Sequence, residues 1–270
     1  MNKEILDKCL FEAVKASVKA GEGILEVYNS DDFDIEIKSD NSPLTRADKK
    51  SNEIIMSYIE NLGFPVLSEE GKELTYEDRK HWETLWCVDP LDGTKEFIKK
   101  NGEFTVNVAL IHNQNPVLGV IYVPVSEELY FAHDQIGSYK IIGKKKIEDI
   151  ELFKDLVNNS DKLPNQKNDG AYKIVASRSH MSAETLEFVE EMKKEHGEVE
   201  LLSKGSALKI CLVAEGMANV YPRFAPTMEW DTAAGHAIVN GASKKLIDFD
   251  TKQPMKYNRE QLRNNWFTVI

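Results

Sequence analysis

The sequence is poor in cysteine and has no long apolar run. Its three cysteines, Cys9, Cys87 and Cys211, lie far apart and include no CxxC pair. This spacing suggests neither a disulfide framework nor a thiolate zinc site, and it fits a reducing cytoplasm. No stretch is apolar over the length that crosses a bilayer, and acids interrupt the apolar residues near the N-terminus. We therefore expect neither a transmembrane segment nor an export signal.

Positive charge is also scarce. The sequence has 34 lysines and arginines against 45 aspartates and glutamates, which gives a net charge of −11. This charge argues against binding to nucleic acid, which requires a basic face, and against attraction to anionic lipid. We therefore expect no nucleic-acid partner, and an anionic ligand must be held by a local basic cluster or by a metal ion. At 270 residues and 41% hydrophobic content, the chain can still bury a sizeable core.

The first half of the sequence predicts helices followed by a sheet. Apolar residues three or four apart predict an amphipathic helix over 4–28, and a second helix should run from an N-cap at Thr45 to Gly63. Short apolar or alternating runs bounded by polar turns predict strands. These runs are 33–38, 64–70, 84–92, 103–111 and 116–125.

The second half predicts an alternation of strands and helices. A polar stretch, 158–170, is the part of the sequence that most resembles a linker, so we expect two halves, 1–165 and 166–270. Strands are expected at 172–177 and 218–223, and helices at 182–197, 206–216 and 230–242. This alternation favours an α/β half that follows an α+β half.

Two aspartates follow the apolar run 84–88, with a proline between them. Pro90 stiffens this turn, so the carboxylates of Asp89 and Asp92 and the carbonyl of Leu91 could converge on one point. Such hard oxygen donors suit Mg²⁺ or Ca²⁺ far better than zinc. The alternative is a surface turn in which each aspartate caps the neighbouring backbone. An EF-hand does not fit, because 89–100 lacks ligands at alternating positions and a glutamate in twelfth place.

Further acids lie at the ends of other predicted elements. Glu69 and Glu70 end the run 64–70, and Asp231 begins the helix 230–242. Taken alone, the two glutamates would be a solvated loop and Asp231 a carboxylate that offsets the helix dipole. Neighbouring strands, however, would bring the glutamates beside Asp89. A cluster of at least four acidic ligands can hold two divalent cations, an arrangement that recurs in phosphoryl transfer to water.

Three motifs in order along the chain carry a family resemblance. They are "SEE" at 68–70, "DPLDGT" at 89–94 and "WDTAAGHAI" at 230–238. With them the sequence resembles the inositol monophosphatase superfamily of Mg²⁺-dependent, lithium-sensitive phosphomonoesterases. Three further segments, 88–111, 177–180 and 211–224, are most similar to its bacterial 3′(2′),5′-bisphosphate nucleotidases. The resemblance implies a layered αβαβα sandwich of the sugar-phosphatase type.

The resemblance also implies roles for individual residues. The metal ligands would hold two Mg²⁺ ions, and Glu70 would assist them or hold a third. Asp48 and Thr94 would orient and deprotonate the attacking water. The implied metal ligands are Glu69, Asp89, the Leu91 carbonyl, Asp92 and Asp231, and the implied substrate-binding residues are Gly93, Thr94, His180, Ser206, Lys209, Arg223 and Asp231. His236, inside an apolar helix, is expected to be a packed core residue.

The activity implied by the resemblance is hydrolysis of the 3′-phosphate of 3′-phosphoadenosine 5′-phosphate, by in-line attack of a metal-activated water, to give AMP. The alternatives are a phosphatase for inositol phosphates or fructose 1,6-bisphosphate, which would use the same metal centre, and a non-catalytic cation- or nucleotide-binding protein. The simultaneous presence of Asp48, Thr94 and the acidic ligands argues against the last. A cytoplasmic location is expected, and the resemblance leaves open peripheral contact with the inner face of the membrane.

Overall fold

A computed structural model of the chain describes residues 1–30, 36–37, 43–167, 170–176 and 181–270. Within these residues the largest element is a sheet of seven strands in the order β3-β4-β5-β6-β7-β8-β9. Strands β3 and β4 are parallel, and all the other neighbours in this sheet are antiparallel. The strands are β3 (Val66–Ser68), β4 (Thr84–Asp92), β5 (Thr105–His112), β6 (Asn115–Val123), β7 (Glu128–His133), β8 (Gly137–Ile142) and β9 (Asp161–Lys162).

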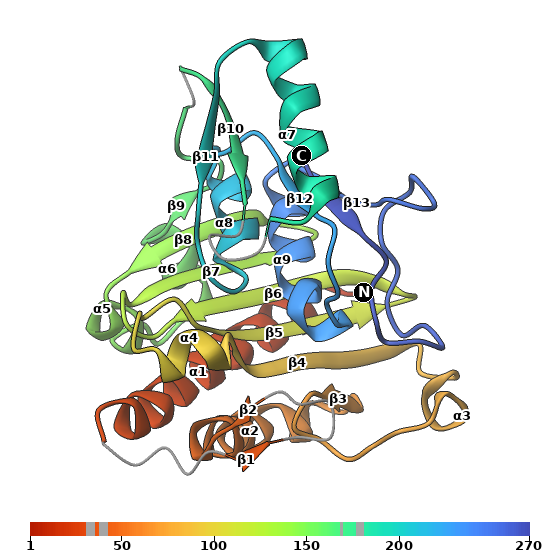
Figure 1. The fold of residues 1–270 in the computed structure, drawn as a ribbon. Helices are drawn as coiled ribbons and strands as arrows, with labels where there is room; N and C mark the ends of the chain where they lie inside the picture. The colour runs from red at the N-terminus through yellow and green to blue at the C-terminus, as the bar shows by residue number, and fades with distance from the viewer. Residues whose placement is uncertain (31–35, 38–42, 168–169, 177–180) are drawn as a thin grey trace.

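Helices cover both faces of this sheet (Figure 1). On one face, α1 (Lys3–Tyr28) and α2 (Arg46–Ile59) pack against side chains such as Trp86 and Val88. On the other face, α8 (Leu208–Glu215) and α9 (Glu229–Gly241) pack against Leu85, Cys87 and Ala109. Successive residues of β4 therefore point into two different cores, because the side chains of a strand alternate between its two faces.

Small residues let α9 lie unusually close to the sheet. A Cβ at Gly119 of β6 would lie 2.3 Å from the carbonyl oxygen of Ala234. Only glycine fits at this position of the strand, because any side chain would displace the helix backbone. Ala234 and Ala237 of α9 are the residues nearest to Gly119, whereas Gly235 faces Ile210 of α8.

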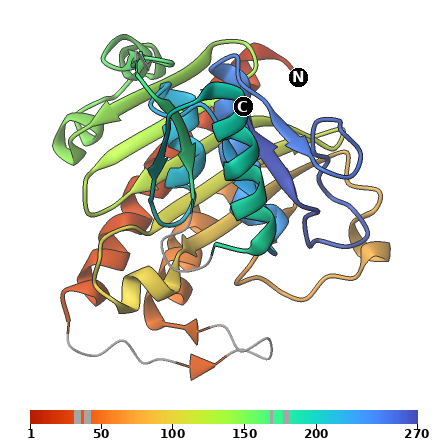
Figure 2. The same cartoon turned by 45° about the horizontal axis from the view of Figure 1, so that its top comes forward.

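The remaining layers come from the second half of the chain. Strands β10 (Tyr172–Val175) and β11 (Val199–Leu202) are parallel, and an antiparallel sheet has the order β12-β14-β13. Helix α7 (Ala183–His196) packs on this layer through Val189, beside Ile174 and Val220. In Figure 2 this layer comes forward, with α7 in front of the large sheet. The small sheet comprises β12 (Tyr221–Arg223), β13 (Leu246–Asp248) and β14 (Phe267–Val269).

Short elements complete the described part of the chain. They are β1 (Glu36–Ile37), β2 (Pro43–Leu44), the 3₁₀ turn Glu60–Leu62, α3 (Tyr76–Arg79), α4 (Thr94–Ile98), α5 (Lys144–Glu148) and α6 (Phe153–Asn158). In the whole described part of the chain, no helix is both long enough and apolar enough to cross a membrane.

The mixed α and β architecture, with helices on both faces of a central sheet, confirms the predicted fold class. The helices expected at 4–28, 182–197 and 230–242 are present, and the second helix passes through its 3₁₀ turn to Gly63, which has a φ of 85°. Most of the strand expected at 33–38 lies outside the described residues.

Three strands of the large sheet, β7, β8 and β9, were not predicted. Strand β9 lies within the polar stretch 158–170, where Leu163 is also buried in the core that α8 and α9 share with the sheet. Part of the expected linker therefore belongs to the large sheet. The division into 1–165 and 166–270 stays a prediction.

Candidate active site

A β-bulge at the end of β4 turns two aspartates to the same face of the sheet. Asp89 lies opposite Asn107, and Asp92 lies opposite Thr105, so two residues of β4 face one residue of β5. In a regular strand, residues three apart point to opposite faces, and one extra residue reverses this. The proline is tolerated because it sits in the bulge, where its missing N–H breaks no ladder bond. The hydroxyl of Ser51 donates to the Pro90 carbonyl at 2.6 Å.

Helix α9 adds a third carboxylate to this pair. Carboxylate oxygens of Asp89, Asp92 and Asp231 lie within 4.8 Å of one another. Asp231 lies in the first turn of α9, where its Oδ2 also accepts from the N–H of Met228 at 2.8 Å. Asp231 therefore caps the helix and belongs to the acidic cluster at the same time.

Strand β3 brings Glu69 to the same end of the sheet. Ser68 pairs with Val88 in the parallel ladder, and the N–H of Glu69 donates to the Val88 carbonyl at 3.1 Å. The charge of Glu69 contributes to the raised pKa of Asp89. The main-chain N–H of Leu91 donates to Asp89 Oδ1 at 3.1 Å, so Leu91 belongs to the same turn. The sequence-predicted ligands thus gather at one place.

The electrostatics of this cluster favour a bound cation. Burial, followed by the charges of Glu69 and Asp92, raises the pKa of Asp89 well above its usual value. Burial raises the pKa of Asp92 to about 6, against the opposing effect of Lys209, and burial together with Asp92 raises that of Asp231 to about 8. Among the described residues, no lysine or arginine forms an ion pair with these three aspartates. Carboxylates crowded in this way, with only oxygen donors, fit Mg²⁺.

Asp48 and Thr94 meet beside the cluster although they lie far apart in sequence. The hydroxyl of Thr94, the first residue of α4, lies 3.3 Å from Asp48 Oδ1 and donates to it. The other oxygen of Asp48 accepts from the N–H and hydroxyl of Thr45, at 2.8 and 2.6 Å, in a capping box. Asp48 is buried, so its capping bonds fix one carboxylate oxygen and leave the second directed at Thr94.

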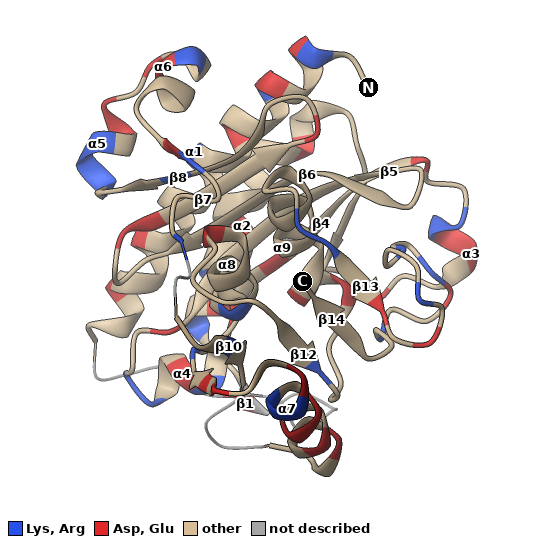
Figure 3. Cartoon of the chain, turned by 90° about the horizontal axis from the view of Figure 1, so that it is seen from above, with Lys and Arg blue, Asp and Glu red and all other residues tan. Residues whose placement is uncertain are grey.

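A cavity of about 480 Å³ opens beside the acidic cluster. It is lined by two of the clustered aspartates, Asp92 and Asp231, and by basic side chains from the second half of the chain and from α4. The predicted residues that line it are Gly93, Ser206, Lys209 and Arg223, and further lining residues include Lys95, Lys99 and Tyr221. Figure 3 shows acidic and basic positions together on α4. His180 lies outside the described residues.

The basic groups of this cavity are suited to an anion. Burial lowers the pKa of Lys209 to about 8, although Asp92 opposes the shift. Arg223 donates through one terminal nitrogen to the Pro226 carbonyl at 3.2 Å, and its buried Nε has no hydrogen-bond partner within the described residues. This N–H is therefore an unused donor for a ligand oxygen, and a ligand that accepts from it would relieve the cost of a buried N–H without a partner.

Ser206, which the resemblance assigns to substrate binding, also contacts two main-chain oxygens. It lines the cavity, and its hydroxyl lies 2.8 Å from the main-chain oxygen of Asp92 and 2.9 Å from that of Glu103. Sequence reasoning missed Glu103, Lys95, Lys99 and Tyr221. Of these, only Lys95 and Lys99 carried a signal, since residues four apart on a helix that follows Gly93 share one face.

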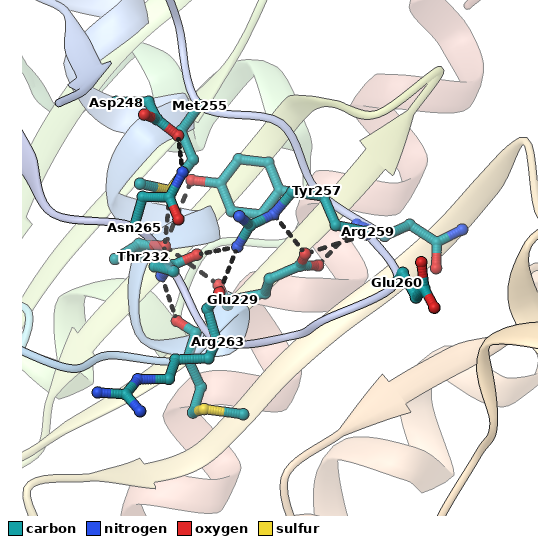
Figure 4. A network of polar contacts seen from close by, with 12 residues as sticks. Glu229, Thr232, Asp248, Met255, Tyr257, Arg259, Glu260, Arg263 and Asn265 are labelled. Carbon is teal, nitrogen blue, oxygen red and sulfur yellow. Dashed lines mark hydrogen bonds and ion pairs between the residues drawn. The ribbon is translucent and has the colours of Figure 1, made fainter. Parts of the chain in front are cut away.

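A buried polar network fixes the first turn of α9, and therefore Asp231 (Figure 4). Glu229 accepts from the N–H groups of Asn258 and Arg259, at 2.6 and 3.1 Å, and from Arg259 Nε at 3.1 Å. The hydroxyl of Tyr257 donates to Thr232, the neighbour of Asp231, at 3.4 Å. Because all these partners come from the segment 257–259, this loop and the helix hold each other in place.

His236 is a core residue, as the sequence indicated. Its side chain is buried, and its Nδ1 lies 3.0 Å from the hydroxyl of Tyr257. Burial lowers the pKa of His236 to about 3, so the ring is neutral. It packs against Tyr257 and is not part of the acidic cluster.

Comparisons with known proteins agree on one family. The model of the inositol monophosphatase family matches residues 5–266. The crystal structure of CysQ from Bacteroides thetaiotaomicron, a bacterial member of that family, is 53% identical, covers 96% of this chain and 95% of its own, and has a TM-score of 0.89. The 3′(2′),5′-bisphosphate nucleotidases CysQ of Shigella flexneri and Escherichia coli (strain K12) are 44% and 43% identical, over 93% of this chain and 94% of theirs.

Proposed function

The chain belongs to the inositol monophosphatase family, and we propose that it is a Mg²⁺-dependent 3′(2′),5′-bisphosphate nucleotidase. It removes the 3′-phosphate of 3′-phosphoadenosine 5′-phosphate and leaves AMP. The observation that carries this proposal is a single cavity lined both by the clustered carboxylates Asp92 and Asp231 and by Lys209 and Arg223. One group of side chains suits the reacting phosphate with its metal, and the other suits a second phosphate.

Different residues are assigned to metal binding and to activation of the attacking water. Mg²⁺ would be held by Glu69, Asp89, the Leu91 carbonyl, Asp92 and Asp231, and when bound it would offset phosphate charge and make a water molecule more acidic. Thr94 orients the attacking water. Asp48 accepts the proton of that water at Oδ1, the carboxylate oxygen that faces Thr94 and takes no part in the capping box.

The second phosphate separates this proposal from the sugar-phosphatase alternative. Phosphatases for inositol phosphates or fructose 1,6-bisphosphate use the same kind of metal centre, so the acidic cluster alone cannot favour one of them. The cavity residues Lys209 and Arg223 favour a nucleotide with a separate 5′-phosphate. They supply local positive charge on a protein with a net charge of −11.

A small substrate panel tests the function directly. With Mg²⁺ present, we expect phosphate release from 3′-phosphoadenosine 5′-phosphate to have a far higher kcat/KM than release from AMP, inositol 1-phosphate or fructose 1,6-bisphosphate. A sugar phosphate as the best substrate would replace the nucleotidase proposal by its alternative. No release from any of the four would contradict both.

Thr94→Ala should lower kcat about tenfold and leave KM nearly unchanged. A contact that orients the water matters mainly in the transition state, and one hydrogen bond to a charged group is worth about 1.5 kcal/mol or more. Thr94→Ser keeps the hydroxyl and serves as the matched control. A raised KM with an unchanged kcat would identify Thr94 as a substrate-binding residue instead.

Arg223→Ala should reduce kcat/KM for 3′-phosphoadenosine 5′-phosphate by about 10- to 100-fold, because it removes a charge-assisted contact worth about 1.5 to 3 kcal/mol. Adenosine 3′-phosphate, which lacks the second phosphate, should be spared. The four measurements form a double-mutant cycle between the arginine and the phosphate.

The control for this cycle is Arg263→Ala. Arg263 is exposed and does not line the cavity, so we expect no change on either substrate. Equal losses on the two substrates in Arg223→Ala would mean that Arg223 supports the fold or the metal site.

A further inference from the structure

Glu103 contacts the loop 204–206, and Ser206 of that loop lines the cavity and touches the Asp92–Gly93 turn. The Glu103 carboxylate accepts from the N–H of Gly205 at 2.9 Å and lies 3.5 Å from the ammonium group of Lys204. Its main-chain oxygen lies 2.9 Å from the hydroxyl of Ser206, which also reaches the main-chain oxygen of Asp92 at 2.8 Å. One residue therefore contacts the loop 204–206 through both its side chain and its backbone.

The Asp92–Gly93 turn, the loop 204–206 and Glu103 are in close contact. A Cβ at Gly93 would lie 2.1 Å from Ser206 Oγ, and a Cβ at Gly205 would lie 2.7 Å from the main-chain oxygen of Glu103. Ser206 itself adopts a φ of 46°, which is uncommon for a residue other than glycine. Such a conformation persists only where the surroundings hold it, and here the holding contacts are those to Glu103 and Asp92.

This junction links the residues assigned to the two phosphates. On one side, the contact to the Asp92 carbonyl reaches the turn Asp92–Gly93, which carries a metal-ligand carboxylate. On the other side, Gly205 and Ser206 lead directly into α8, whose second residue is Lys209. The Glu103 carboxylate is only 17% exposed, so water competes weakly for its bond to Gly205.

We propose that Glu103 is a positioning residue that sets the spacing between the Asp92–Gly93 turn and the beginning of α8, and so the preference for a substrate with two phosphates. This inference rests on the proposed function. A substrate held at one phosphate tolerates a shift of one loop relative to the other. A substrate held at both phosphates does not, because a small misplacement of the reacting group lowers the rate steeply.

The test compares Glu103 variants that differ in reach on two substrates, 3′-phosphoadenosine 5′-phosphate and adenosine 3′-phosphate. Glu103→Ala should lower kcat/KM for the bisphosphate about tenfold, with less than a twofold change for the monophosphate. Glu103→Gln keeps an oxygen at the same distance and should restore most of the preference. Glu103→Asp keeps the charge but is shorter by one methylene, and it should resemble the alanine variant.

Two controls separate positioning from charge and from stability. Lys204→Ala removes only the ion pair and should retain the preference, since a pair with a half-exposed lysine contributes little. Glu187→Ala removes an exposed acid on α7 and should change nothing. Thermal unfolding of each variant shows whether it is folded, and the glutamine and aspartate variants carry the test if the alanine variant is not.

The outcomes distinguish this inference from the proposed function. Equal losses on both substrates, a glutamine variant as poor as the alanine variant, or unchanged kinetics in the alanine and aspartate variants would overturn the role of Glu103 and leave the function standing. A wild-type protein with no preference for the bisphosphate would overturn the function and this inference with it.

Discussion

Removal of divalent cations with EDTA should abolish phosphate release, and added Mg²⁺ should restore it. The oxygens of Asp89, Asp92 and Asp231 lie within 4.8 Å of one another. At an effective dielectric constant of about 20, two unit charges at such a distance repel by about 3 to 4 kcal/mol. A phosphate dianion brought to this cluster without a cation would meet repulsion of this size from each ionised carboxylate, so the metal-free protein should neither bind nor hydrolyse its substrate.

A second measurement makes this prediction independent of activity. A cation that binds the folded state and not the unfolded chain stabilises the protein in proportion to the logarithm of its concentration. We therefore expect the unfolding temperature to rise as Mg²⁺ is added to the EDTA-treated protein, whereas K⁺ at the same ionic strength should have a much smaller effect. Appreciable turnover after thorough metal removal would contradict the metal site.

Much of the architecture could be predicted from the sequence because local patterns decide it. The helix over Lys3–Tyr28 has apolar residues at helical spacing, and Gly216 and Gly63 end their helices with left-handed backbone, as glycine favours. Strand β8 was missed because Lys140 in "GSYKII" indicates an exposed position. In the fold this lysine is buried and pairs with Glu128 and Glu215, at 2.6 and 3.2 Å, which no local pattern reveals.

The candidate site shows the same division between local and long-range information. The acids at the ends of β3 and β4 were visible as sequence motifs, and the parallel pairing of these strands brings them together. Two further features depend on contacts between distant segments. The bulge that turns Asp89 and Asp92 to one face depends on pairing with β5, and the bond from Ser206 to the Asp92 carbonyl joins residues 114 positions apart. Glu103 has no sequence signature because its role lies in what it touches.

Asp92→Asn should lower kcat by about 100-fold or more at saturating Mg²⁺. The substitution keeps the size and shape of the side chain and removes one negative charge from a residue that we propose as a metal ligand. Loss of a single preorganised electrostatic contributor typically costs 10²- to 10³-fold in rate. Asp250→Asn is a matched control, because Asp250 is exposed and lies outside the cavity, and we expect it to retain full activity.

The same substitution should have the opposite effect on stability without metal. Burial and the neighbouring carboxylates raise the pKa of Asp92 to about 6, above its usual value, so at pH 7 its ionised form is less favourable in the folded state than in the unfolded chain. Asparagine removes this penalty, and EDTA-treated Asp92→Asn should therefore unfold at a higher temperature than the EDTA-treated wild type. With Mg²⁺ the order should reverse, because the variant binds the cation less tightly. A variant with near-normal turnover and the wild-type response to Mg²⁺ would show that Asp92 is only a turn residue.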